Sequence, residues 1–97
     1  MAKEVIWTIS AFKDLQNIVA YISEDSPYYA MSFYEDVMDK AKTLMNFPHR
    51  GRIVPELDDP NMRELFVHRY RIIYRVSNDN VIITTIIHGA RDYRGEE

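Results

Sequence analysis

The stretch RELFVHRYRIIYRVSNDNVIITTIIHGARD, residues 63–92, decides how the rest of the chain is arranged. Its first part threads arginines between Leu, Phe, Val, Ile and Tyr, a polar turn follows, and the last part is an almost unbroken apolar segment. Runs rich in β-branched and aromatic residues predict strands, here over about 63–67, 70–77 and 80–88. Strands this apolar belong in a core, so the arginines within them need a structural or a functional reason.

The pair Asn78-Asp79 predicts a two-residue hairpin turn between the last two of these strands. A three-residue turn would flip one strand relative to the other, and we prefer the shorter turn because it points one apolar face at the helices. That face then consists of Tyr70, Ile72, Tyr74, Val76, Val81, Ile83, Thr85 and Ile87. The opposite face carries Ile73, Ile82, Thr84 and Ile86 and gathers the polar residues Arg69, Arg71, Arg75 and His88.

Length and composition limit the class of protein. The 97 residues predict one domain spanning 1–97, and 46% hydrophobic with 28% charged residues is typical of a globular chain. The lack of cysteine excludes disulfides, thiolate metal sites and a Cys nucleophile, as expected in the cytoplasm. The first twenty residues do not resemble a signal peptide, and no apolar run approaches the roughly 18 residues of a membrane span. We therefore expect a cytoplasmic protein without a membrane partner.

Charge is distributed unevenly along the chain. The net charge of −3 gives no general attraction for nucleic acid. Every lysine precedes residue 43 and every arginine follows residue 49. Residues 49–75 hold six arginines against four acidic residues, a local excess of two positive charges. Since arginine presents a planar fork suited to carboxylate or phosphate, this region is the candidate binding region.

The first half of the chain predicts one strand and two helices. The strand covers 4–9, a helix with Ser10 as its N-cap covers about 10–24, and a second helix starts at Ser26-Pro27 and reaches about Asn46. One apolar stripe of the second helix consists of Ala30, Phe33, Val37, Ala41 and Leu44. A second stripe beside it consists of Met31, Tyr34, Met38 and Met45. Two stripes indicate two neighbours, the domain's own core and a partner chain, although a wide core face is the simpler interpretation.

These elements predict an α+β domain with the order β-α-α-β-β-β. A helical hairpin then packs on one face of a small, mainly antiparallel sheet, and the other face carries the arginines. A long loop over 48–61 separates the two halves, and loops of this length are often functional.

With these features the chain resembles the RelE/ParE superfamily of toxins from type II toxin–antitoxin systems. The similarity lies in the element order, in YRIIYRV at 70–76, in IIHGARD at 86–92 and in GRIVPELDDPNMREL at 51–65. The resemblance implies a plasmid-stabilisation type of toxin that inhibits growth and is neutralised by a RelB- or ParD-like antitoxin, with operator DNA bound only through the antitoxin. The second stripe, Met31, Tyr34, Met38 and Met45, is then the predicted antitoxin surface.

The resemblance also implies two kinds of target, and whether the protein is an enzyme depends on which of them it acts on. ParE-like members poison DNA gyrase without being nucleases, whereas RelE-like members cut mRNA on the ribosome. In a nuclease, Arg71 and Arg91 would stabilise phosphate and His88 would act as acid or base, with Glu56 a weaker candidate base. A salt bridge from Arg71 to Glu64 is the structural alternative. The predicted target surface consists of Arg63, Arg69, Arg71, Arg75 and Arg91.

Departures from the RelE-like pattern favour the gyrase interpretation. Residues 64–67 are Glu-Leu-Phe-Val where the nucleases carry lysines. The nucleases also use a tyrosine several residues after the final arginine, whereas Tyr93 lies only two residues after Arg91. Ribosome-dependent nucleases are usually strongly basic, whereas this chain is acidic. A degenerate, non-toxic member is a third alternative. We predict no cofactor and no metal, because no glycine-rich phosphate loop occurs and the three histidines lack metal-ligand spacing.

Overall fold

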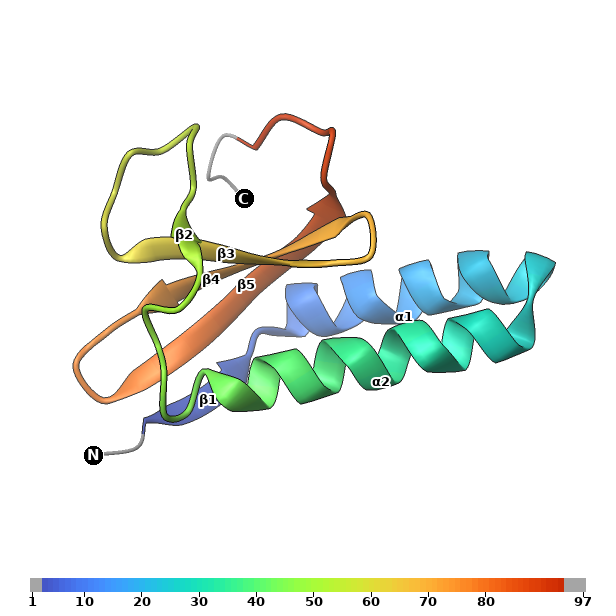
Figure 1. Ribbon diagram of the computed structural model, residues 1–97, viewed down its shortest axis with the longest axis horizontal. Coiled ribbons are helices and arrows are strands. Elements are labelled where there is room, and N and C mark those ends of the chain that lie inside the picture. Colours follow the sequence, from blue (N-terminus) through green and yellow to red (C-terminus); the bar gives the residue numbers. More distant parts are fainter. Residues whose placement is uncertain (1–2, 94–97) are drawn as a thin grey trace.

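Two helices lie against one face of a five-stranded sheet in the computed structural model, which describes residues 3–93 (Figure 1). The elements are β1 (Glu4–Trp7), α1 (Ile9–Asp25), α2 (Pro27–Thr43), β2 (Arg52–Ile53), β3 (Met62–Val67), β4 (Tyr70–Val76) and β5 (Asn80–His88). The strand order is β1-β5-β4-β3-β2, with β1 parallel to β5 and the other pairs antiparallel. The predicted α+β class and mainly antiparallel sheet are confirmed, and β2 is a short strand that we had placed in the loop.

The helical hairpin extends beyond the sheet, so the α1–α2 turn lies at one end of the molecule (Figure 1). Ser26 caps α2 by accepting a hydrogen bond from the Tyr29 N–H at 3.1 Å, and Pro27 occupies the first turn, as predicted. The N-cap of α1 is Thr8 and not Ser10, since Thr8 is extended and its hydroxyl accepts from the Ala11 N–H at 3.0 Å. No helix of residues 3–93 is long and apolar enough to cross a membrane.

The core lies between the helices and the sheet. All five residues of the first predicted α2 stripe are buried. Four of them share one cluster with Leu65, Val67, Ile72 and Tyr74 of the central strands, namely Phe33, Val37, Ala41 and Leu44. In α1, Ala11 and Leu15 are fully buried, whereas Phe12 is half exposed. A second, smaller cluster of Val54, Met62 and Ile73 lies apart from this core, with Leu57, Ile87 and Tyr93 packed on it. This cluster holds the 54–61 loop and the segment after β5 on the sheet.

The predicted hairpin register is correct near the turn and wrong beyond it. Val76 pairs with Val81 and Tyr74 with Ile83, but the register shifts between Ile73 and Tyr74. A β-bulge adds one residue to β5, so the remaining residues of that strand exchange faces. Consequently Ile86 enters the main core, Ile87 joins the second cluster, and His88 pairs with Tyr70.

Hydrogen bonds to Asp14 of α1 stabilise the bulge. Its Oδ2 atom accepts hydrogen bonds from the Thr85 hydroxyl at 2.8 Å and from the Ile86 N–H at 3.2 Å. The Thr84 hydroxyl donates to the Ile73 carbonyl at 3.2 Å, which provides a further contact across the irregular site. A carboxylate from the first helix therefore satisfies a backbone donor at the position where the strand ladder is disturbed.

Candidate functional site

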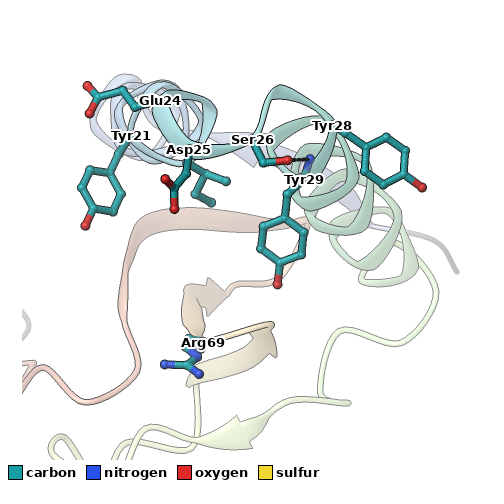
Figure 2. Close-up of a pocket in the computed structure, with 8 residues that line it drawn as sticks. Tyr21, Glu24, Asp25, Ser26, Tyr28, Tyr29 and Arg69 are labelled. Carbon is teal, nitrogen blue, oxygen red and sulfur yellow. Dashed lines mark hydrogen bonds between the residues drawn. The ribbon is translucent and has the colours of Figure 1, made fainter.

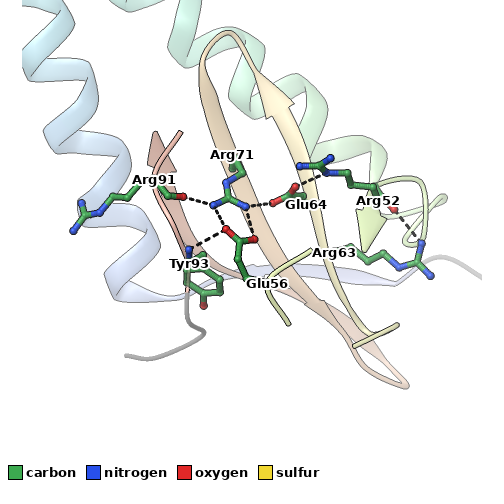
Figure 3. Close-up of polar contacts among 8 residues, drawn as sticks. Arg52, Glu56, Arg63, Glu64, Arg71, Arg91 and Tyr93 are labelled. Carbon is green, nitrogen blue, oxygen red and sulfur yellow. Dashed lines mark hydrogen bonds and ion pairs between the residues drawn. The ribbon is translucent and has the colours of Figure 1, made fainter. Parts of the chain in front are cut away.

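Arg71 lies at the centre of a buried charge network on the sheet face opposite the helices (Figure 3). Its Nη1 and Nη2 atoms donate to the two carboxylate oxygens of Glu56 at 3.0 and 2.8 Å, and Nη1 also donates to Glu64 at 2.9 Å. Nη2 donates in addition to the Arg91 carbonyl oxygen. The Arg71 side chain is 3% exposed, and its Nε is the one buried side-chain nitrogen or oxygen atom of the described residues that lacks a hydrogen-bond partner.

Three neighbouring segments supply the partners of Arg71. Glu64 of β3 has a fully buried side chain and bridges Arg71 to Arg52 of β2, whose Nε lies 2.5 Å from Glu64 Oε2. Glu56 comes from the loop after β2, and its Oε2 also accepts the Tyr93 N–H at 3.1 Å. Two arginines thus face two carboxylates, and the network joins β2, β3, β4, the loop and the segment after β5.

The network sets the protonation states of its members. The Arg71 guanidinium holds the pKa of Glu56 at about 2, well below its ordinary 4.5, despite partial burial. The Glu56 carboxylate in turn raises the pKa of Arg71 further above its already high value. Glu56 is therefore ionised at neutral pH and is too weak a base to take a proton from a hydroxyl group, which argues against it as a general base.

Gly51 and Tyr74 fix the start of the loop beside this network. The Gly51 N–H donates to the Tyr74 hydroxyl at 3.0 Å, and burial raises the pKa of Tyr74. A Cβ atom at Gly51 would lie 2.5 Å from the Glu64 carbonyl oxygen and 2.6 Å from the Tyr74 hydroxyl. The close approach of the loop to β3 therefore requires glycine at this position.

The other arginines of the predicted target surface lie in separate environments. Arg63 holds the loop, since its side chain donates to the carbonyl oxygens of Pro60, Gly51 and His49 at 2.8, 3.0 and 3.3 Å. Arg69, Arg75 and Arg91 are exposed. Arg75 shares the Arg71 face of β4 but lies near the opposite end of the strand, and Arg69 lies in the β3–β4 turn.

The expected gathering of Arg69, Arg71, Arg75 and His88 on one face is therefore wrong. The bulge moves His88 to the helix side, where its ring lies 5.5 Å from that of Tyr70. Of the nuclease candidates, Arg71 contacts Glu56 and the backbone of Arg91, whereas His88 lies apart from them. The predicted roles of Arg71, Arg91 and His88 in a nuclease stay predictions.

The second α2 stripe forms an exposed apolar surface. Met31, Tyr34, Met38 and Met45 are between 37% and 56% exposed, so they are not part of the core. This favours the partner-chain interpretation of the stripe over the wide core face. That the partner is an antitoxin stays a prediction at this point.

Sequence reasoning missed two polar groups that the fold brings together. One is the contact of Asp14 with β5, and the other is a cluster in which His68 lies between Tyr29 and Asp36 of α2. The helical spacing of Tyr29 and Asp36, two turns apart on one face, was the available signal. No group of three or more metal-ligating side chains occurs within residues 3–93.

The fold and this site define a class, the small α+β toxins of the RelE/ParE superfamily. A family model described as the ParE toxin of the type II toxin–antitoxin system parDE matches residues 5–93, so the chain belongs to this family. It is 36% identical over 89 residues to a Caulobacter vibrioides protein named Toxin RelE2, covering 91% of this chain and 97% of that protein. A solved chain of the chromosomal ParDE TA system from P. aeruginosa has the same fold, with a TM-score of 0.72, 23% identity and coverage of 90% and 96% of the two chains.

Proposed function

We propose that this toxin inhibits DNA gyrase by binding to it, without a catalytic residue of its own. The observation that carries the proposal is the state of Arg71. A guanidinium that stabilises phosphate in a nuclease must be free to meet its substrate, whereas this one is buried and bonded to Glu56, Glu64 and the Arg91 carbonyl oxygen.

The electrostatics around Arg71 also support a protein target over RNA. Two carboxylates lie within hydrogen-bond distance of the guanidinium, and they would repel an incoming phosphate group. Glu56, with its pKa of about 2, is unsuited to deprotonating a ribose hydroxyl group. His88, the remaining acid or base candidate, lies with Tyr70 on the other face of the sheet.

Ribosome-dependent mRNA cleavage is the second candidate function. The name of the C. vibrioides relative, Toxin RelE2, and the exposed Arg75 and Arg91 favour it. In this alternative the network would have to open so that Arg71 reaches the RNA. A protein that has kept the fold but lost toxicity is the third.

We further propose that a cognate antitoxin covers the second α2 stripe. The stripe exposes Met31, Tyr34 and Met38 on α2 and Met45 in the turn that follows it, an adaptable apolar surface of the kind that receives an amphipathic helix. The relation to a solved ParDE system is consistent with such a partner. Met38→Glu should weaken antitoxin binding about tenfold or more while leaving the thermal midpoint within a few degrees of the parent. The exposed Lys13→Glu exchange on α1 is the control.

Two assays on the purified chain separate the targets. The first measures supercoiling by DNA gyrase and the accumulation of cleaved DNA complexes. The second measures cleavage of mRNA on translating ribosomes. The proposal expects inhibition in the first assay and none in the second. Cut mRNA with unaffected gyrase would overturn it in favour of the nuclease, and no effect in either assay from a folded protein would favour the non-toxic alternative.

A further inference from the structure

A cleft of about 790 Å³ opens at the end of the helical hairpin. Its walls come from the end of α1, the start of α2 and the β3–β4 turn (Figure 2). A smaller hollow of about 280 Å³ shares Ile22, Tyr29 and Arg69 with it and continues toward Phe33 and Tyr70. We call the two together the tyrosine cleft. It shares no residue with the second α2 stripe.

The tyrosine cleft carries opposite charges on facing walls. Tyr21, Asp25 and Tyr29 project from the helices toward the side on which Arg69 lies (Figure 2). Within residues 3–93 neither the Asp25 carboxylate nor the Arg69 guanidinium takes part in a side-chain hydrogen bond or an ion pair. These charges differ from those around Arg71, which are neutralised inside the protein.

One wall of the tyrosine cleft is held rigidly. The Tyr29 hydroxyl lies 3.1 Å from His68 Nδ1, and His68 Nε2 lies 2.7 Å from the Asp36 carboxylate. The His68 ring also packs edge-on against Phe33 at 5.5 Å. His68 adopts a φ of 55°, an unfavourable conformation for a residue other than glycine, and the contacts on both ring nitrogens stabilise it. Tyr29 is therefore positioned before any ligand arrives.

The exposed aromatic residues fit a protein ligand. Tyr21, Tyr28 and Tyr29 are 70%, 85% and 50% exposed, and tyrosine and arginine are the residue types enriched at binding hot spots. A wall that is already rigid loses little conformational entropy on association. Nucleic acid and anionic lipid fit less well, because Glu24 and Asp25 among the lining residues would repel phosphate.

We infer that the tyrosine cleft is the surface through which this toxin docks on its target protein. The charges specify the chemistry of the target segment, which presents a basic side chain to Asp25 between the tyrosine rings and an acidic side chain to Arg69. The inference rests on the proposed function, because that function names DNA gyrase as the target protein.

Charge reversal on the full-length toxin tests the inference. Asp25→Lys and Arg69→Glu should each weaken binding to purified gyrase at least tenfold, and Tyr21→Ala should have a similar effect. Glu35→Lys and Lys13→Glu make the same charge changes at exposed helix positions outside the cleft and should alter binding less than twofold. Urea unfolding of every variant establishes that it is folded, and antitoxin binding is measured in parallel.

Each outcome distinguishes the cleft from the identity of the target. Folded cleft variants that bind gyrase like the parent overturn the inference and leave the proposed function intact. Variants that lose the antitoxin but keep gyrase also overturn it. If the parent does not bind gyrase, the proposed function fails, and the effect of the cleft variants on growth tests the cleft. Cleft variants that no longer inhibit growth but still bind the antitoxin support the cleft as the contact to another target. Cleft variants that still inhibit growth overturn the inference. A parent that neither binds gyrase nor inhibits growth overturns both.

Discussion

The Arg71 network and the tyrosine cleft contain similar side chains but use them differently. Around Arg71 each charge faces an opposite charge at hydrogen-bond distance, and Arg71 and Glu64 at its centre are almost closed to solvent. In the tyrosine cleft Asp25 and Arg69 stay unpaired with each other and face the same open space (Figure 2). The comparison indicates that arginines in apolar strands need not be binding residues. We assign the network to stability and the cleft to recognition, and the following changes test that division.

Arg71→Ala should have the largest effect on stability. It would leave the fully buried Glu64 with only the more exposed Arg52 as counter-ion, and Glu56 without its bidentate partner. Removing one partner of a buried ion pair costs about 3–5 kcal/mol, which would unfold a large part of the population of so small a domain. Urea unfolding monitored by circular dichroism measures the loss. Arg75→Ala, an exposed arginine of the same strand, should change stability by less than about 0.5 kcal/mol, and equal effects would contradict the assignment.

Gly51→Ala should follow in magnitude. Its new methyl group would lie 2.5 Å from a backbone oxygen of β3, so the loop that supplies Glu56 would have to move. Overpacking of this kind costs roughly 1–3 kcal/mol. Gly89→Ala is the matched comparison and should cost less, because its Cβ atom would lie 3.0 Å from the Arg69 carbonyl oxygen and 3.0 Å from the Phe66 ring. A thermal midpoint that falls equally for both variants would show that the Gly51 contact is not special.

Acid should weaken the protein through Glu56. Because its folded pKa of about 2 lies below the ordinary 4.5, its contribution is complete at neutral pH and is lost as the pH falls from 4.5 toward 2. Allowing for partial exposure, that contribution is roughly 2 kcal/mol. Glu56→Gln should flatten the stability curve over this range. A variant as acid-sensitive as the parent would place the loss at other carboxylates.

Tyr21→Ala should change stability least. Its side chain is largely exposed at the end of α1, so the free energy of unfolding should stay within about 0.5 kcal/mol of the parent. A larger loss in the same urea experiment would mean that the cleft wall is part of the scaffold.

Much of the fold could be predicted because its signals are local. Ser26-Pro27 defines the start of α2 and the alternating strand around Arg71 defines β4, as the structure confirms. The bulge could not be found this way, since it depends on Asp14, which is 72 residues from Ile86 along the chain. Thr8 and Ser10 are both competent N-caps, and only the strand-to-helix geometry decides between them.

The site was predicted less completely than the fold. The salt bridge from Arg71 to Glu64 was the structural alternative and is present. Glu56 was considered only as a base, because the sequence does not show that the loop folds back over β4. The His68 cluster joins residues more than thirty positions apart, and its nearest sequence signal, two polar residues two turns apart on α2, is common on any helix.

The most direct test replaces the network and then measures toxicity. In Arg71→Met with Glu56→Gln and Glu64→Gln, no buried charge is left uncompensated, and such neutral replacements often retain stability. After circular dichroism has established that the variant is folded, inhibition of gyrase supercoiling and of growth is compared with the parent. The account predicts inhibition within about twofold of the parent, since Arg71 contributes stability and not chemistry. A folded variant that has lost its toxicity would contradict it.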